Sequence, residues 1–242
     1  MEFALSQDQE ELLATVRAVL AKRSDPAAVR AALAAEQGYD TELWNLLCEQ
    51  IGVAALGIPE EHDGAGATLF ESLLVLEELG RTLTPSPLLS TVLVAEALLA
   101  GADDDARTAL LPRLAAGEVA AFVDLDSDDP VLDADRASWF VVATGETLGV
   151  VEGVDAHATW TPSMDQTLRF GGVRIEPDAV RPIGAAQPAR DRIALVGAAA
   201  TAALAVGCAA RGLEMTVEYS RTRVQFGRPI GSFQAQIGRA HV

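Results

Sequence analysis

Residues that commonly carry chemistry are scarce in this sequence. Aromatic residues make up 5% of its 242 residues, and it has two cysteines and three histidines. The cysteines, Cys48 and Cys208, lie in apolar helical patterns without a paired spacing, so we expect two reduced thiols. The histidines (His62, His157 and His241) lack the HExxH and Cys/His spacings, which argues against a dedicated zinc site.

Basic residues are also few. The chain has 18 Lys and Arg against 35 Asp and Glu, a formal net charge of −17. Such a balance repels a phosphate backbone, so nucleic acid is a poor partner. The N-terminus lacks the basic, apolar and small-residue order of a signal peptide. The most apolar stretch, 193–210, approaches membrane-span length but is rich in Ala and Gly and flanked by charge. We therefore expect a buried core helix in a soluble, cytoplasmic protein with no membrane partner.

Common catalytic motifs are missing as well. There is no Gly-x-Ser-x-Gly nucleophile motif. The glycine-rich stretch 63–67 fits neither the Walker nor the Rossmann pattern, and a turn explains it better. The acidic stretch 124–129 lacks the EF-hand spacing, which favours a solvated loop over a cation site.

What the sequence does have is a clear order of helices, strands and helices. In the first hundred-odd residues apolar side chains recur at helical spacing, with capping boxes predicted at Ser6 and Thr68. Clusters of β-branched residues broken by Gly, Pro and Asp then predict a small sheet of short strands. A long helical pattern follows from Asp191 to about Val224, as one helix or two. This order predicts an α+β fold with an N-terminal all-α domain (1–117), a reduced middle β domain (118–184) and the start of a C-terminal helical domain (185–242).

One segment, 219–234, stands out. It reads Tyr-Ser-Arg-Thr-Arg-Val-Gln-Phe-Gly-Arg-Pro-Ile-Gly-Ser-Phe-Gln, with three arginines inside eight residues. In an acidic chain this is a local basic spot suited to a diphosphate or a carboxylate. A basic helix C-terminus that merely complements the helix dipole is the alternative, and composition alone favours that alternative.

The segment resembles the Tyr-x3-Arg-x-x-Phe-Gly-x-Pro-Ile-x-x-x-Gln signature of the acyl-CoA dehydrogenase family. Three other stretches agree in order. The stretch 58–66 is similar to the family's Pro-Glu-x-x-Gly-Gly-x-Gly loop, 77–81 to the helix after that loop, and 165–173 to the last strands of the middle domain. The resemblance covers nearly the whole chain.

The resemblance implies an oligomeric flavoprotein of fatty acid or steroid degradation. Such enzymes remove two hydrogens across Cα–Cβ of an acyl-CoA thioester, with FAD as hydride acceptor and an electron-transferring flavoprotein as the next acceptor. By the same resemblance, Arg223 would reach the FAD diphosphate across a subunit interface. Gln225, Phe226 and Gly227 would lie in the same pocket, and Gln234 would approach the flavin from the next helix.

The chain departs from the family pattern in three places. Where the family has Thr-Glu-Pro-x-x-Gly-Ser-Asp, residues 122–129 contain four aspartates, which would repel a diphosphate. The position at which some members carry the catalytic Glu is Gly197, so no catalytic residue is assigned. The family's helical bundle would need three further helices, so we expect 193–206 to be left uncovered. Residues 236–242 depart abruptly from the pattern, and our hypothesis is that they are not native.

Three functions are consistent with these residues. The chain is a catalytic dehydrogenase whose Glu lies outside this sequence, or a partner subunit with a degenerate flavin site that pairs with a second dehydrogenase subunit or with itself. The third is a non-catalytic helical interaction protein derived from the family. The run of aspartates and the short middle region favour the partner subunit.

Overall fold

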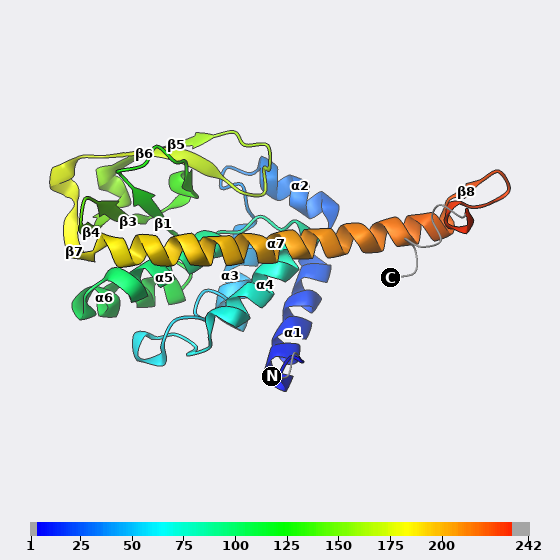
Figure 1. The fold of residues 1–242 in the computed structure, drawn as a ribbon, viewed down its shortest axis with the longest axis horizontal. Coiled ribbons are helices and arrows are strands. Elements are labelled where there is room, and N and C mark those ends of the chain that lie inside the picture. The colour runs from blue at the N-terminus through cyan, green and yellow to red at the C-terminus, as the bar shows by residue number, and fades with distance from the viewer. Residues whose placement is uncertain (1–3, 234–242) are drawn as a thin grey trace.

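The computed structural model describes residues 4–233, and Figure 1 shows a body of helices and strands crossed by one long helix. The helices before the strands are α1 (Gln7–Arg23), α2 (Pro26–Ala34), α3 (Thr41–Leu46), α4 (Leu69–Thr82), α5 (Leu88–Gly101) and α6 (Asp104–Ala115). Both predicted capping boxes are present: Ser6 caps α1 together with Gln9, and Thr68 caps α4 together with Glu71. Each box satisfies backbone N–H groups that an α-helix leaves unpaired at its start.

The middle of the chain forms two sheets rather than the single small sheet expected. The strands are β1 (Ala120–Asp124), β2 (Val131–Leu132), β3 (Trp139–Thr144), β4 (Thr147–Glu152), β5 (Ala156–Thr161), β6 (Phe170–Ile175) and β7 (Arg181–Ala185). One sheet has the order β1-β3-β4-β7, and the other has the order β2-β6-β5. The pair β1 and β3 is parallel, and the other pairs in the two sheets are antiparallel.

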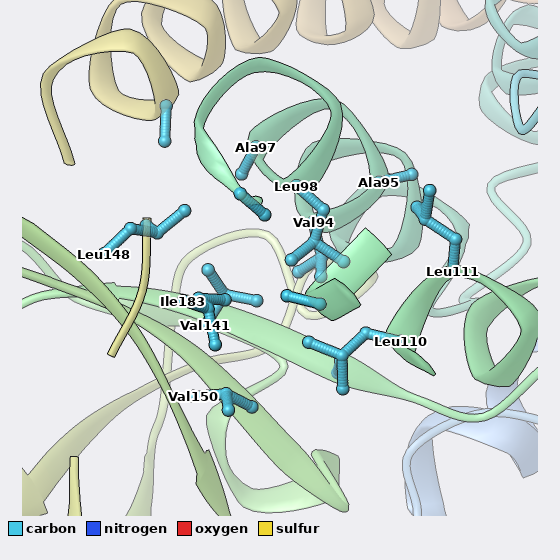
Figure 2. Packing of buried hydrophobic residues seen from close by; sticks show 14 of the residues in the cluster. Val94, Ala95, Ala97, Leu98, Leu110, Leu111, Val141, Leu148, Val150 and Ile183 are labelled. Atoms are coloured by element: carbon cyan, nitrogen blue, oxygen red, sulfur yellow. The ribbon is translucent and has the colours of Figure 1, made fainter. Parts of the chain in front are cut away.

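Strand β3 is buried on both faces and fixes the layers of the body. Val141 packs in a cluster with Val94 and Leu98 of α5, whereas Phe140 and Val142 pack in a cluster with residues of the second sheet. Successive side chains of a strand point to opposite faces, so the four-stranded sheet lies between helices and the second sheet. Figure 2 shows the helix side of this core. The α+β fold class predicted from the sequence is confirmed.

The long helix is α7 (Ala186–Thr222), a single helix of 37 residues and about 55 Å. One stripe of mostly small side chains on α7 packs against α4 and α5. The buried residues of α7 are Ala186, Ala189, Val196, Ala200, Gly207 and Ser220. The rest is open: the side chains of Leu195 and Val206 are 66% and 55% exposed.

The exposure of α7 decides between two expectations. The expectation that 193–206 would be left uncovered is confirmed for much of the helix, and the expectation of a buried core helix is wrong, since 17% of its most apolar window is buried. Length and composition alone would also allow α7 to cross a membrane. That criterion is weak, because core helices of globular proteins meet it too.

Candidate functional site

The basic segment singled out in the sequence forms a hairpin at the far end of α7. Helix α7 stops at Thr222, and Arg223 leads into β8 (Val224–Gln225), which pairs with β9 (Arg228–Pro229). The two turn residues, Phe226 and Gly227, both have positive φ, 52° and 80°. Two-residue hairpin turns require this conformation, which glycine adopts at no cost and a phenylalanine rarely adopts. Figure 1 shows the hairpin projecting beyond the body of the protein.

The side chains of the hairpin are held out to solvent. Phe226 is 93% exposed, and its ring lies edge-on to Phe233 with the centroids 6.4 Å apart. The guanidinium of Arg228 lies 4.1 Å from the centroid of the Phe233 ring. Arg223 is exposed, and no acidic side chain of residues 4–233 lies within ion-pair distance of it. The hairpin therefore presents an arginine and an aromatic ring that are not used within the described part of this chain.

Four of the five predicted site residues come together here. Arg223, Gln225, Phe226 and Gly227 belong to the hairpin, and Gln234 lies outside the described residues. These assignments stay predictions, because a flavin contact requires a second molecule.

A cavity of about 490 Å³ lies at the other end of α7. Its walls come from α5, β1, the loop 125–130, β2, β6 and the first half of α7; the apolar side chains among them are Leu89, Leu93, Phe122, Val131, Leu132, Leu168, Phe170, Ile193 and Ala194. A second cavity of about 220 Å³ adjoins it between α4 and α7 and shares Leu89, Leu168 and Thr201 as walls.

The acidic loop beside this cavity is clamped to α7 by Arg190. The Arg190 guanidinium donates to both carboxylate oxygens of Asp124, at 2.7 and 2.8 Å, and to Asp126 Oδ2 at 2.6 Å. It also donates to the carbonyl oxygen of Gly145 at 2.6 Å. These hydrogen bonds lower the pKa of Asp124. The expectation of a solvated loop is confirmed for 125–130, which is exposed, while Asp124 and Asp126 are in addition paired with Arg190.

No pattern in the sequence marked Arg190 as a functional or structural residue. It lies 66 residues from Asp124 along the chain, and its role depends on α7 lying beside β1. An arginine in a helix is otherwise an ordinary surface residue.

A diphosphate fits the hairpin and does not fit the cavity. Four aspartates lie in the acidic stretch beside the cavity, Asp124, Asp126, Asp128 and Asp129. Arg190 already makes four hydrogen bonds, to Asp124, Asp126 and the Gly145 carbonyl oxygen. The hairpin offers an exposed guanidinium, the group that best matches phosphate oxygens.

The hairpin is also too far from this cavity to serve it. Thr201 is the last residue of α7 in the cavity wall, and Arg223 follows 22 residues later, about 33 Å along the helix axis. Helix α7 is continuous over that distance. Arg223 therefore does not reach this cavity of its own chain.

Gly197 lies on the part of α7 that borders the cavity, at the position expected to carry the catalytic Glu in some family members. It lies one turn after Ile193, and a Cβ added to it would sit 3.7 Å from Leu93 Cδ2. A side chain at this position would therefore point toward the wall that Leu93 forms, where this chain has only hydrogen.

Two family models and several known proteins match this chain in sequence. Residues 6–118 match the family model "Acyl-CoA dehydrogenase, N-terminal domain", and residues 191–239 match "Acyl-CoA dehydrogenase, C-terminal domain". The acyl-CoA dehydrogenase IpdE2 of Mycolicibacterium smegmatis is 45% identical over 231 residues, which cover 96% of this chain and 70% of IpdE2. The Mycobacterium tuberculosis protein of the same name is also 45% identical, over 95% of this chain and 69% of its own length.

Solved structures give the same result for the fold. The ChsE4-ChsE5 complex from Mycobacterium tuberculosis superposes with a TM-score of 0.80 at 25% identity, covering 97% of this chain and 72% of the matched chain. A variant of the Tcur3481-Tcur3483 steroid ACAD superposes with a TM-score of 0.82 at 24% identity, over 96% of this chain and 72% of that chain. The chain belongs to the acyl-CoA dehydrogenase family.

Proposed function

We propose that this chain is the partner subunit of a heteromeric, FAD-dependent acyl-CoA dehydrogenase, and that its C-terminal hairpin lends Arg223 to an FAD held mainly by the neighbouring subunit. The separation of the hairpin from this chain's own cavity is the observation that carries the proposal. Cys208 is the last α7 residue that lines either of the two cavities, and Arg223 follows 15 residues later, about 22 Å along the helix axis, so we infer that its guanidinium acts on a different chain.

The reaction proposed for the complex is α,β-dehydrogenation of an acyl-CoA thioester. FAD would accept the hydride, and an electron-transferring flavoprotein would take the electrons onward. This chain's contribution is to bind and orient: Arg223 offers two parallel N–H donors to a phosphate, and Phe226 offers an exposed ring beside it. In this proposal the neighbouring subunit removes the proton, and Gly197, the position at which some family members carry the Glu, has no side chain to accept it.

The open face of α7 is apolar: from Ala194 to Ala210 the helix has no charged residue, and much of that surface is exposed. The three further helices of the family's bundle would pack on this face, so the support for a partner comes from the relatives. The ChsE4-ChsE5 relative is itself described as a complex, which supports a second dehydrogenase subunit as the partner over a second copy of this chain.

The test is the flavin content of the complex after single arginine substitutions. Arg223→Ala should reduce the FAD retained per complex at least about tenfold on gel filtration, since it removes a charge-assisted phosphate contact. Arg221→Ala is the matched control, because it removes the same charge from the same helix end and should leave flavin content unchanged. Equal flavin retention by both variants would remove the role assigned to Arg223.

A further inference from the structure

We propose that a small cavity between α2 and the β5–β6 hairpin binds a tetrahedral oxyanion such as phosphate, held by Arg136 and Arg169. The cavity lies where the loop 162–169, which joins β5 to β6, reaches the end of α2 (Figure 1). Neither Arg223 nor a flavin takes part in this site. The inference therefore goes beyond the proposed function and does not depend on it.

The size of the cavity limits its ligand to one charged group. Its volume is about 120 Å³, well below the range of about 300–1,000 Å³ that whole cofactors and other small-molecule ligands occupy. A free phosphate ion fits this space, and so does the terminal phosphate of a molecule whose remainder lies outside. The apolar part of the wall comes from Leu33, Trp160, Pro162 and Leu168, so the recognition of charge depends on the two arginines.

Gly38, in the segment that follows α2, allows the two arginines to meet. Its φ is 66°, and a Cβ on it would overlap Arg136 Nη2 and lie 2.7 Å from Arg169 Nη1. The two nitrogens are therefore close neighbours, and all three residues line the same cavity. A single oxyanion in the cavity can accept a hydrogen bond from both arginines.

Both guanidiniums have a donor left over for a ligand. The Arg136 side chain is 2% exposed, and its Nη1 donates to Asp133 Oδ1 at 2.9 Å. Its Nε is buried without an acceptor anywhere in residues 4–233, which leaves Nη2 as the donor that a ligand can reach. Arg169 donates Nε and Nη2 to Asp135, which leaves its Nη1. Buried polar groups normally have a partner, so this under-used buried cation indicates a site for an anion.

The charge inside the cavity is positive. Both arginines line it, whereas Asp133 and Asp135 are not among its lining residues. The pKa of Arg136 is lowered, mainly by burial and also by the nearby positive charge of Arg169, against the opposing effect of Asp133. Two neighbouring cations repel each other, and an anion that contacts both replaces this repulsion with attraction.

The directions of the donors favour a tetrahedral ion over a planar carboxylate. A carboxylate pairs best with two parallel N–H groups of one guanidinium. Here each arginine offers one nitrogen, and the amide of Gln166 lines the same cavity as a third polar group. A tetrahedral ion presents its oxygens in several directions and can accept from donors that come from different residues.

The first test is isothermal titration calorimetry of the purified full-length protein with inorganic phosphate, glycerol 3-phosphate and acetate. Chloride keeps the ionic strength constant, because salt screens exposed charges. Phosphate, or the monoester, should bind at least about tenfold more tightly than acetate. Binding of inorganic phosphate alone would identify a free ion as the ligand, and binding of the monoester would identify the end of a longer molecule. If acetate binds as tightly as both, or if neither phosphate compound binds, the proposal is wrong.

A pair of glycine variants locates the binding. Gly38→Ala places a methyl group against both guanidiniums and should weaken phosphate binding at least about tenfold. Gly52→Ala is the matched control, because Gly52 also has a positive φ, 76°, and nothing lies within 4 Å of a Cβ there. Both variants carry the same kind of backbone strain, and only the first changes the cavity. Equal phosphate affinities of the two variants would overturn the assignment to this cavity.

A pair of arginine variants tests the site without a change of backbone. Arg169→Gln removes one of the two cations and should also weaken phosphate binding at least about tenfold. Arg174→Gln, at an exposed position of β6 outside the cavity wall, should bind phosphate as the wild type does. Equal loss of affinity in both variants would show that phosphate responds only to the net charge of the protein, which would contradict the site. Flavin retention should be unchanged in all four variants, so failure here leaves the role of Arg223 untouched.

Discussion

Gly207 of α7 lies directly against the backbone of α4, so close that a Cβ on it would overlap the carbonyl oxygen of Glu77. The contact is reciprocal, because Gly80 of α4 lies equally close to the backbone of Leu204 on α7. Two glycines thus let the helices cross at backbone contact. This crossing fixes the direction in which α7 leaves the body, and hence the place of the hairpin that follows it.

Gly207→Ala should therefore destabilise the protein by about 1–3 kcal/mol or more, because the added methyl has only rigid backbone to displace. Gly212→Ala is the matched control: nothing lies within 4 Å of a Cβ there, so it should stabilise the helix by about 0.5–1 kcal/mol. Urea unfolding of both variants measures the difference. Equal changes in the free energy of unfolding for the two variants would contradict the backbone contact between α4 and α7.

The Arg190 clamp predicts a second difference between arginines. Arg190→Ala removes charge-assisted hydrogen bonds to partly buried carboxylates and should lower the free energy of unfolding by about 1–3 kcal/mol. Arg107 pairs with Asp104, whose side chain is 95% exposed, so Arg107→Ala should change the free energy of unfolding by less than about 1 kcal/mol. Thermal unfolding at low and high salt compares them. If the hydrogen bonds of Arg190 do not stabilise the fold, Arg190→Ala and Arg107→Ala will lower the unfolding temperature by similar, small amounts.

Asp133 predicts a dependence of stability on pH. It is fully buried, accepts hydrogen bonds from Ser90 and Arg136, and lies near Asp135; burial raises its pKa to about 6. The folded protein then holds a proton that the unfolded chain, titrating near 3.8, has lost. The stability from this group is present below about pH 4 and is lost as pH rises through about 6.

The check is urea unfolding of the wild type and of Asp133→Asn between pH 4 and 7. The free energy of unfolding of the wild type should fall as pH rises over this window. That of the variant should not show this fall. Above about pH 6, where Asp133 is ionised in the wild type, the variant also leaves buried Arg136 without its charged partner. Parallel pH profiles would mean that Asp133 does not titrate in this range.

Local signals in the sequence predicted much of the fold. Capping boxes depend on residues three apart, so Ser6 and Thr68 marked helix starts correctly. The β-branched pair Val141-Val142 marked β3, because such residues fit a strand buried on both faces. The start of α7 was expected at about residue 191 and lies at Ala186, since tertiary contacts extend the helix beyond its own periodicity.

Long-range geometry was the part that sequence patterns did not predict. The number of sheets and the Arg190 clamp both depend on segments far apart in the chain. Phe226 and Gly227 were predicted as site residues, but only the structure shows that they form a turn held away from the body. That position fits the role proposed for Arg223 across a subunit interface.

The most direct test of the partner-subunit account is the visible flavin absorbance of this chain expressed alone and together with a second dehydrogenase subunit. The account predicts that the chain alone is colourless and inactive, and that the purified complex contains FAD and dehydrogenates an acyl-CoA. A yellow, active assembly made from this chain alone would contradict it.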